Sequence, residues 1–151
     1  TGTGVTIDDI PVSLAVGKSE IAYDAENANL AIVAIGSTVY PAIAAAVKLK
    51  AEGINARVIN ARFVKPLDEG LLCDTAKSIK RIITVEENVL MGGFGSAVLE
   101  LLEEKGIHDV IIKRLGIRDK FVEQATQKEL RRMYGIDDEG IIAAAKSVIK
   151  Q

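Results

Sequence analysis

A run of six apolar side chains, Leu30 to Ile35, is followed at once by Gly36. The run has no polar position that would mark a side facing solvent, which is typical of a strand buried on both of its faces. Such a strand needs a packed layer on each side of its sheet. The run therefore predicts a sheet that is covered by helices above and below.

The rest of the chain alternates short β-branched runs with longer stretches of helical periodicity. Apolar residues recur at helical spacing from Thr38 to Glu52, with Pro41 in the first turn and Gly53 after the last one. This alternation predicts a mainly parallel sheet with right-handed crossovers. The other predicted elements are strands at Arg57 to Asn60, Arg81 to Glu86 and Val110 to Leu115, a helix capped by Asp68, and a helix from Phe94 to Lys105.

The two ends of the chain complete the predicted fold. A first strand is predicted at Val16 to Tyr23, and the polar turn that joins it to the Leu30 run is too short for a crossover helix, so this strand is predicted to be an antiparallel edge. Two final helices begin at a capping box of Thr126 with Glu129 and at Asp137. The predicted fold class is α/β: a three-layer α/β/α domain with about five strands, mostly parallel, and one antiparallel edge strand.

The length and net charge of the chain limit the number of domains and the classes of partner that we expect. The 151 residues fit one domain, which we place at 13–151, and the polar stretch 1–12 is interpreted as a linker or arm. With 19 basic and 21 acidic residues the net charge is −2, so nucleic acid is not an expected partner. No apolar stretch approaches the roughly 20 residues of a membrane span, so no membrane association is expected.

The cysteine and histidine content is low. The single Cys73 cannot form an intrachain disulfide, and no Cys/His cluster has the spacing of a metal site. We therefore expect no metal ligands in this chain. We also expect the protein to reside in a reducing compartment. The bacterial cytoplasm is the first choice, and a plastid is the alternative.

In an open parallel sheet, ligands bind where strands end and helices begin. Either Glu86 or Glu87 could act as a general acid or base, but a carboxylate pair at a strand end more often caps a helix or bonds across an interface. No catalytic residue is assigned on this basis. The polar side chains predicted along this edge are Arg62, Glu86, Glu87, Asn88, Arg118 and Asp119.

The glycines Gly92, Gly93 and Gly95 precede a predicted helix and have two interpretations. Their backbone N–H groups could bind an anion. A tight turn into a closely packed helix is favoured, because the stretch lacks the Lys-Ser/Thr of a phosphate loop and the spacing of a dinucleotide motif. Nearby polar residues are interpreted in structural terms: Ser37 as a helix N-cap, and Arg131 as part of a solvated helix face.

Three longer strings carry a resemblance to a known family: Asn60 to Asp68, Thr84 to Ser96 and Leu115 to Glu123. From about Val16 to Lys150 the chain resembles the carboxy-terminal domain of 1-deoxy-D-xylulose-5-phosphate synthases. More loosely, it is similar to transketolases and to the β subunits of 2-oxoacid dehydrogenases. It departs from the synthase pattern at Arg118, where proline is usual, and at Gln124-Ala125.

The resemblance implies one part of an enzyme that joins pyruvate to glyceraldehyde 3-phosphate with loss of CO2, in non-mevalonate isoprenoid synthesis. Thiamine diphosphate and Mg²⁺ would be held by two preceding domains and not by this chain, so the chain alone is expected to be inactive. The implied partners are those domains and a second copy in a homodimer.

The resemblance also suggests a role for the predicted edge. Glu87 and Asn88 are expected to orient the strand-to-helix turn through hydrogen bonds. Two alternatives stay open, namely a separate subunit of a split transketolase or 2-oxoacid dehydrogenase, and a free-standing module that binds an anion at the glycine turn. The candidate residues for an interface, or for support of the nearby active site, are Arg62, Lys65, Glu86, Glu87, Asn88 and Asp119.

Overall fold

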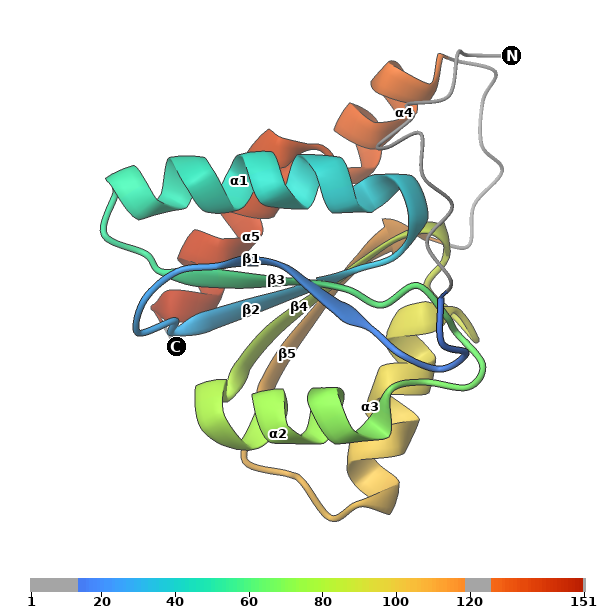
Figure 1. Cartoon of the computed structure of the whole chain (residues 1–151). Coiled ribbons are helices and arrows are strands. Elements are labelled where there is room, and N and C mark those ends of the chain that lie inside the picture. The colour runs from blue at the N-terminus through green and yellow to red at the C-terminus, as the bar shows by residue number, and fades with distance from the viewer. Residues whose placement is uncertain (1–13, 119–125, 151) are drawn as a thin grey trace.

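The computed structural model describes residues 14–118 and 126–150, so the predicted arm at 1–12 and the candidate Asp119 lie outside it (Figure 1). The strands are β1 Glu20–Asp24, β2 Leu30–Ala34, β3 Ala56–Asn60, β4 Arg81–Val89 and β5 Ile111–Ile117. The helices are the short 3-10 turn η1 Gly36–Thr38, α1 Val39–Ala51, α2 Glu69–Ile79, α3 Phe94–Glu104, α4 Gln127–Tyr134 and α5 Asp138–Ile149.

The strands form one five-stranded sheet in the order β1-β3-β2-β4-β5. Strand β1 is antiparallel to β3, and the other neighbouring pairs are parallel. Helices α1 and α5 cover one face, and α2 and α3 cover the other (Figure 1). The predicted three-layer fold with an antiparallel edge is thus confirmed.

Strand β2 contributes to both hydrophobic cores, because each of its faces packs against a different layer of helices. Leu30 and Ile32 pack in the cluster that includes α1 and α5, whereas Ala31 and Val33 pack in the cluster with α2 and α3. All four side chains are fully buried. The unbroken apolar run in the sequence is therefore a consequence of the central position of this strand.

The predicted first strand differs from the observed one in its bounds and its neighbour. The prediction placed it at Val16 to Tyr23 beside the Leu30 run, but β1 begins at Glu20 and pairs with β3. The turn after β1 crosses the start of β3, where the Ala25 N–H donates to the Ala56 carbonyl at 3.2 Å. Strand β3 is thereby inserted between the two strands that are consecutive in the sequence.

The predicted helix starts are confirmed at atomic detail. Asp68 accepts a hydrogen bond from the Leu71 N–H at 3.2 Å, and Asp137 accepts one from the Gly140 N–H at 2.9 Å. Thr126 forms the predicted capping box of α4 with the residue three positions on. Helix α4 differs from the other α-helices in having no buried residue, so its position depends on few contacts.

The strand order creates a point where connections diverge. Strand β2 leads into α1 on one face of the sheet, while β4 leads into α3 on the other, and β2 and β4 are neighbours. Ligands of open α/β sheets bind beside the carboxyl ends of strands at such a point. The residues after β2 and at the end of β4 are therefore the first place to look for a functional site.

Candidate functional site

Strand β4 is irregular where it reaches this point. Val85 pairs with Leu115 and Val89 pairs with Ile117, so three residues of β4 lie opposite Gly116 alone. A Cβ atom on Gly116 would lie 2.8 Å from a Leu90 methyl carbon, which explains why glycine is needed for this close approach. Bulges of this kind redirect side chains at the edge of a sheet.

Glu86 is fully buried and caps helix α3. Its carboxylate accepts hydrogen bonds from the Phe94 N–H at 2.7 Å and the Gly95 N–H at 2.8 Å. Gly93 lies so close to this carboxylate that a Cβ atom there would overlap it. The helix-capping interpretation of the glutamate pair thus describes Glu86, and the turn packs tightly around it.

This geometry bears on the predicted anion site at the glycine turn. The N–H groups of Phe94 and Gly95 point at the Glu86 carboxylate, so in this structure they have an internal partner. An external anion at the same place would also meet the negative charge of that carboxylate. The tight-turn interpretation fits these contacts better than anion binding does.

Glu87 is next to Glu86 on β4, and its side chain lies on the other face of the strand. It is the centre of a polar cluster. The Ser37 hydroxyl donates to Glu87 Oε2 at 2.5 Å, and Arg131 Nε donates to Oε1 at 2.5 Å. The Gln127 amide lies 3.3 Å from Oε1. These four residues, which we call the Glu87 cluster, join η1, the end of β4 and helix α4.

The environment of Glu87 favours its ionised form. Partial burial opposes ionisation, but hydrogen bonds from Ser37 and Arg131, together with the guanidinium charge, outweigh it and hold the pKa of Glu87 below its ordinary value. A general acid or base works best with a pKa near the operating pH. Glu87 is therefore better suited to holding α4 in place than to proton transfer.

Two structural interpretations made from the sequence are wrong in this region. Ser37 does not cap α1 but lies within η1 and bonds across to Glu87. Arg131 is not part of a solvated face, since its side chain is only 24% exposed in its ion pair with Glu87. Ser37 and Arg131 lie 50 and 44 residues from Glu87 in the sequence, so no local pattern could have indicated these contacts.

The other predicted edge residues lie apart from this cluster. Arg62 donates to Glu20 at 2.6 Å beside the antiparallel edge strand. Lys65 is exposed in the β3–α2 connection. Asn88 is exposed, and across residues 14–118 and 126–150 its side chain makes no hydrogen bond, so the expectation that it orients the turn has no contact in its support.

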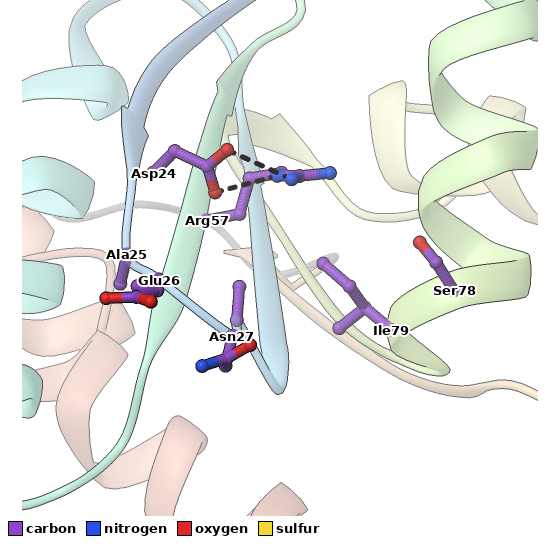
Figure 2. Close-up of a pocket in the computed structure, with 8 residues that line it drawn as sticks. Asp24, Ala25, Glu26, Asn27, Arg57, Ser78 and Ile79 are labelled. Atoms are coloured by element: carbon purple, nitrogen blue, oxygen red, sulfur yellow. Dashed lines mark hydrogen bonds and ion pairs between the residues drawn. The ribbon is translucent and has the colours of Figure 1, made fainter.

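Two hollows flank helix α4, and a third lies at the opposite end of the sheet. A cavity of about 200 Å³ lies against α4 and is lined by Glu87, Ile117, Gln127, Leu130, Arg131, Tyr134 and Ile136. A groove of about 700 Å³ separates α4 from the start of α1. The third hollow, of about 440 Å³, contains an ion pair in which Arg57 donates to Asp24 through two contacts of 2.9 Å (Figure 2).

Three further features of the described residues concern metal ligation, thiol reactivity and membrane-spanning helices. They contain no group of three or more His, Cys, Asp or Glu side chains placed to hold a metal ion. Burial raises the pKa of the Cys73 thiol, which leaves it a poor nucleophile. Among the helices in the described ranges, none combines the length and apolar character that crossing a bilayer requires.

Comparison with known proteins shows the family to which this chain belongs. Residues 19–141 match the family described as Transketolase, C-terminal domain, and the chain belongs to this family. Among curated proteins, the 1-deoxy-D-xylulose-5-phosphate synthase of Syntrophus aciditrophicus (strain SB) is 59% identical over 149 residues, covering 99% of this chain and 23% of that protein. The corresponding synthase 1 of Geobacter metallireducens is 53% identical over 149 residues, covering 99% of this chain and 24% of that protein.

A solved structure gives the same result for the fold. A protein described as a split gene transketolase, inactive beta4 tetramer, superposes with a TM-score of 0.83 at 32% identity, covering 92% of this chain and 44% of that one. The resemblance to the carboxy-terminal domain of the synthases and the three-layer fold are therefore confirmed. The chain spans only 23% of the length of the Syntrophus synthase, so it matches one part of that protein.

Proposed function

We propose that the chain is the carboxy-terminal domain of a 1-deoxy-D-xylulose-5-phosphate synthase. The whole enzyme would condense pyruvate with glyceraldehyde 3-phosphate, release CO2 and serve isoprenoid precursor synthesis in a bacterial cytoplasm. The observation that carries this proposal is the 59% identity to the Syntrophus synthase over 149 residues. Identity to the split gene transketolase is only 32%, which favours a synthase over a transketolase subunit.

Among residues 14–118 and 126–150, the side chains do not fit the cofactors that such an enzyme needs. Mg²⁺ requires several oxygen ligands, and no acidic cluster among the described residues provides them. A diphosphate could be held by free backbone N–H groups, but those at the start of α3 already donate to Glu86. Thiamine diphosphate and Mg²⁺ would therefore be bound by the part of the enzyme that precedes this domain.

A structural role at an interface is supported by the β4–α3 turn. Glu86 stabilises the turn by accepting a hydrogen bond from the Phe94 N–H, and Arg114 donates to the Leu90 carbonyl at 3.0 Å. The tip still exposes apolar side chains, with Val89 42% and Met91 75% accessible to solvent. A rigid turn with an apolar tip suits packing against the remaining domains or a second copy in a homodimer.

A chimera tests the proposed function directly. In the Syntrophus synthase, the matching 149-residue region would be replaced by this chain, and release of CO2 from pyruvate with glyceraldehyde 3-phosphate would be measured. We expect turnover within about tenfold of the parent enzyme, because activity depends on domain packing that the two sequences share. The isolated chain should give no turnover under the same conditions.

The matched control is a chimera that carries the carboxy-terminal region of the split gene transketolase instead. That region has the same fold as this chain but is only 32% identical to it. The control chimera should therefore assemble less well and turn over more slowly. A folded chimera with this chain that is no more active than the control chimera would contradict assignment to the synthases. Turnover by the isolated chain would contradict the structural role.

A further inference from the structure

The groove between α1 and α4 is the largest of the hollows described above, at about 700 Å³. Sites for small molecules span about 300–1,000 Å³, so the groove has the size of such a site. One wall comes from the first half of α1 and includes Tyr40, Pro41 and Ala44. The other comes from α4 and the start of α5, and it includes Lys128 and Arg132.

The charges in this groove are only partly neutralised by the protein itself. Lys128 and Arg132 are four residues apart on α4, so they share one face of the helix and repel each other. Within residues 14–118 and 126–150, neither side chain forms an ion pair. Arg131, which also lines the groove, is held by Glu87.

The acidic side chains at the other end of the groove are mostly engaged. Asp138 pairs with Lys48 at 2.6 Å, and Asp137 caps α5 by accepting from the Gly140 N–H at 2.9 Å. Glu139 is exposed and would repel an anion at that end. The free positive charge is therefore concentrated at the α4 wall, near Lys128 and Arg132.

Tyr40 gives the groove an aromatic surface. Its side chain is 43% exposed, and its hydroxyl makes no hydrogen bond within the described parts of the chain. Pro41 and Ala44 extend the apolar surface beside it. An exposed aromatic ring in the same groove as two cations without an ion-pair partner in the described ranges suits stacking on a planar ring and binding of its phosphates at the same time.

We propose that this groove binds a small phosphorylated ligand that carries a planar ring, the chemistry of a nucleotide. The phosphates lie between Lys128 and Arg132, and the ring packs against Tyr40. The proposal does not depend on the proposed synthase function, because it concerns a surface on this chain alone. Its test and the chimera test can fail independently of each other.

The test is a titration of the 151-residue chain with ATP, followed by backbone NMR in the absence of divalent cations. Shifts should cluster at Tyr40, Ala44, Lys128 and Arg132. The double substitution Lys128→Gln with Arg132→Gln should weaken binding about tenfold or more, because two charge-assisted contacts are lost. Tyr40→Leu should weaken binding of ATP about fivefold and leave the weaker binding of tripolyphosphate unchanged.

The control removes the same positive charge elsewhere. Lys50→Gln with Lys77→Gln alters exposed lysines that do not line the groove, and it should leave the ATP affinity unchanged. An equal loss in this control would reduce the binding to general charge attraction and overturn the proposal. The same conclusion follows if no shifts appear at millimolar ATP, or if Tyr40→Leu has no effect on ATP binding.

Discussion

The two ends of the sheet each contain an Arg–carboxylate pair, but the pairs are built differently. At the amino end, Arg57 on β3 bonds Asp24 on the neighbouring β1, and the two side chains are 27% and 42% exposed. At the carboxyl end, Arg131 bonds Glu87, and Ser37 and Gln127 complete the shell of donors. The first pair joins strands that the sheet already joins, whereas the second attaches a helix that has few other contacts.

This difference indicates how stability should be distributed. Contacts that duplicate a backbone ladder add little, because the strands are held in any case. Contacts that satisfy buried groups or tie distant segments cost more when they are removed. Substitutions at the carboxyl end of the sheet should therefore lower the free energy of unfolding more than substitutions at the amino end.

The largest effect is expected for Glu86→Ala at the carboxyl end. Removing the carboxylate leaves the N–H groups of Phe94 and Gly95 buried without partners, which should lower the free energy of unfolding by about 3 kcal/mol. Urea denaturation measures this change. Glu86→Gln keeps one acceptor oxygen and should lose about half as much. A loss below about 1 kcal/mol in the alanine variant would mean that the cap is not needed.

Gly95→Ala comes next, because a Cβ atom there would lie 2.6 Å from Thr84 Oγ1 and 2.9 Å from Arg114 Cδ. The overpacking should cost about 2 kcal/mol in the free energy of unfolding. Gly70→Ala is the matched control, since it also lies in the first turn of a helix and its nearest atom would be 3.7 Å away. That control should stabilise the chain by about 0.5–1 kcal/mol, and thermal melts of both variants would separate crowding from helix propensity.

Glu87→Gln should have a smaller effect, a loss of about 1 kcal/mol at pH 7, because the ion pair is partly exposed. The pKa of Glu87 is lower in the folded chain than its ordinary value of about 4.3, so its contribution is present above that pH. The contribution disappears as the pH falls through the folded value. Denaturation of both chains from pH 7 to pH 3 should show the difference between them shrinking with acid, and a constant difference would contradict the assignment.

The smallest effect is expected for Asp24→Asn at the amino end. The pair it breaks is exposed and lies on strands that are already joined, so the loss should be about 0.5 kcal/mol or less. It should disappear in high salt, because exposed charges are screened. A loss as large as that of Glu87→Gln would remove the contrast between the two ends.

The fold was largely predictable from the sequence because its signals are local. The caps at Asp68, Thr126 and Asp137 each involve residues no more than three positions apart. The burial of β2 is indicated by one continuous run of apolar residues. The position of β1 was not predictable in the same way. Its pairing depends on which strand is inserted beside it, and that choice is made by the crossover through α1.

The candidate site was predictable only in part. A carboxylate at the end of β4 marked the region, because strand ends meet at one edge of a parallel sheet. The donors to Glu87 come from η1 and α4, and their side chains meet it only through the order of the strands. Nothing in the sequence near Ser37 or Arg131 distinguishes them from polar residues that lie on the open surface.

The antiparallel direction of β1 has a consequence for connectivity. Its first residue, Glu20, pairs with Asn60 at the carboxyl end of β3, and the Ser19 N–H is fixed there by Asp68 at 3.0 Å. The described chain therefore enters the sheet at the same edge that carries the Glu87 cluster. Linking two folded parts in one chain can raise their effective concentration to the order of millimolar. A covalently linked neighbour could thus remain bound at this edge through contacts too weak to hold it as a separate molecule.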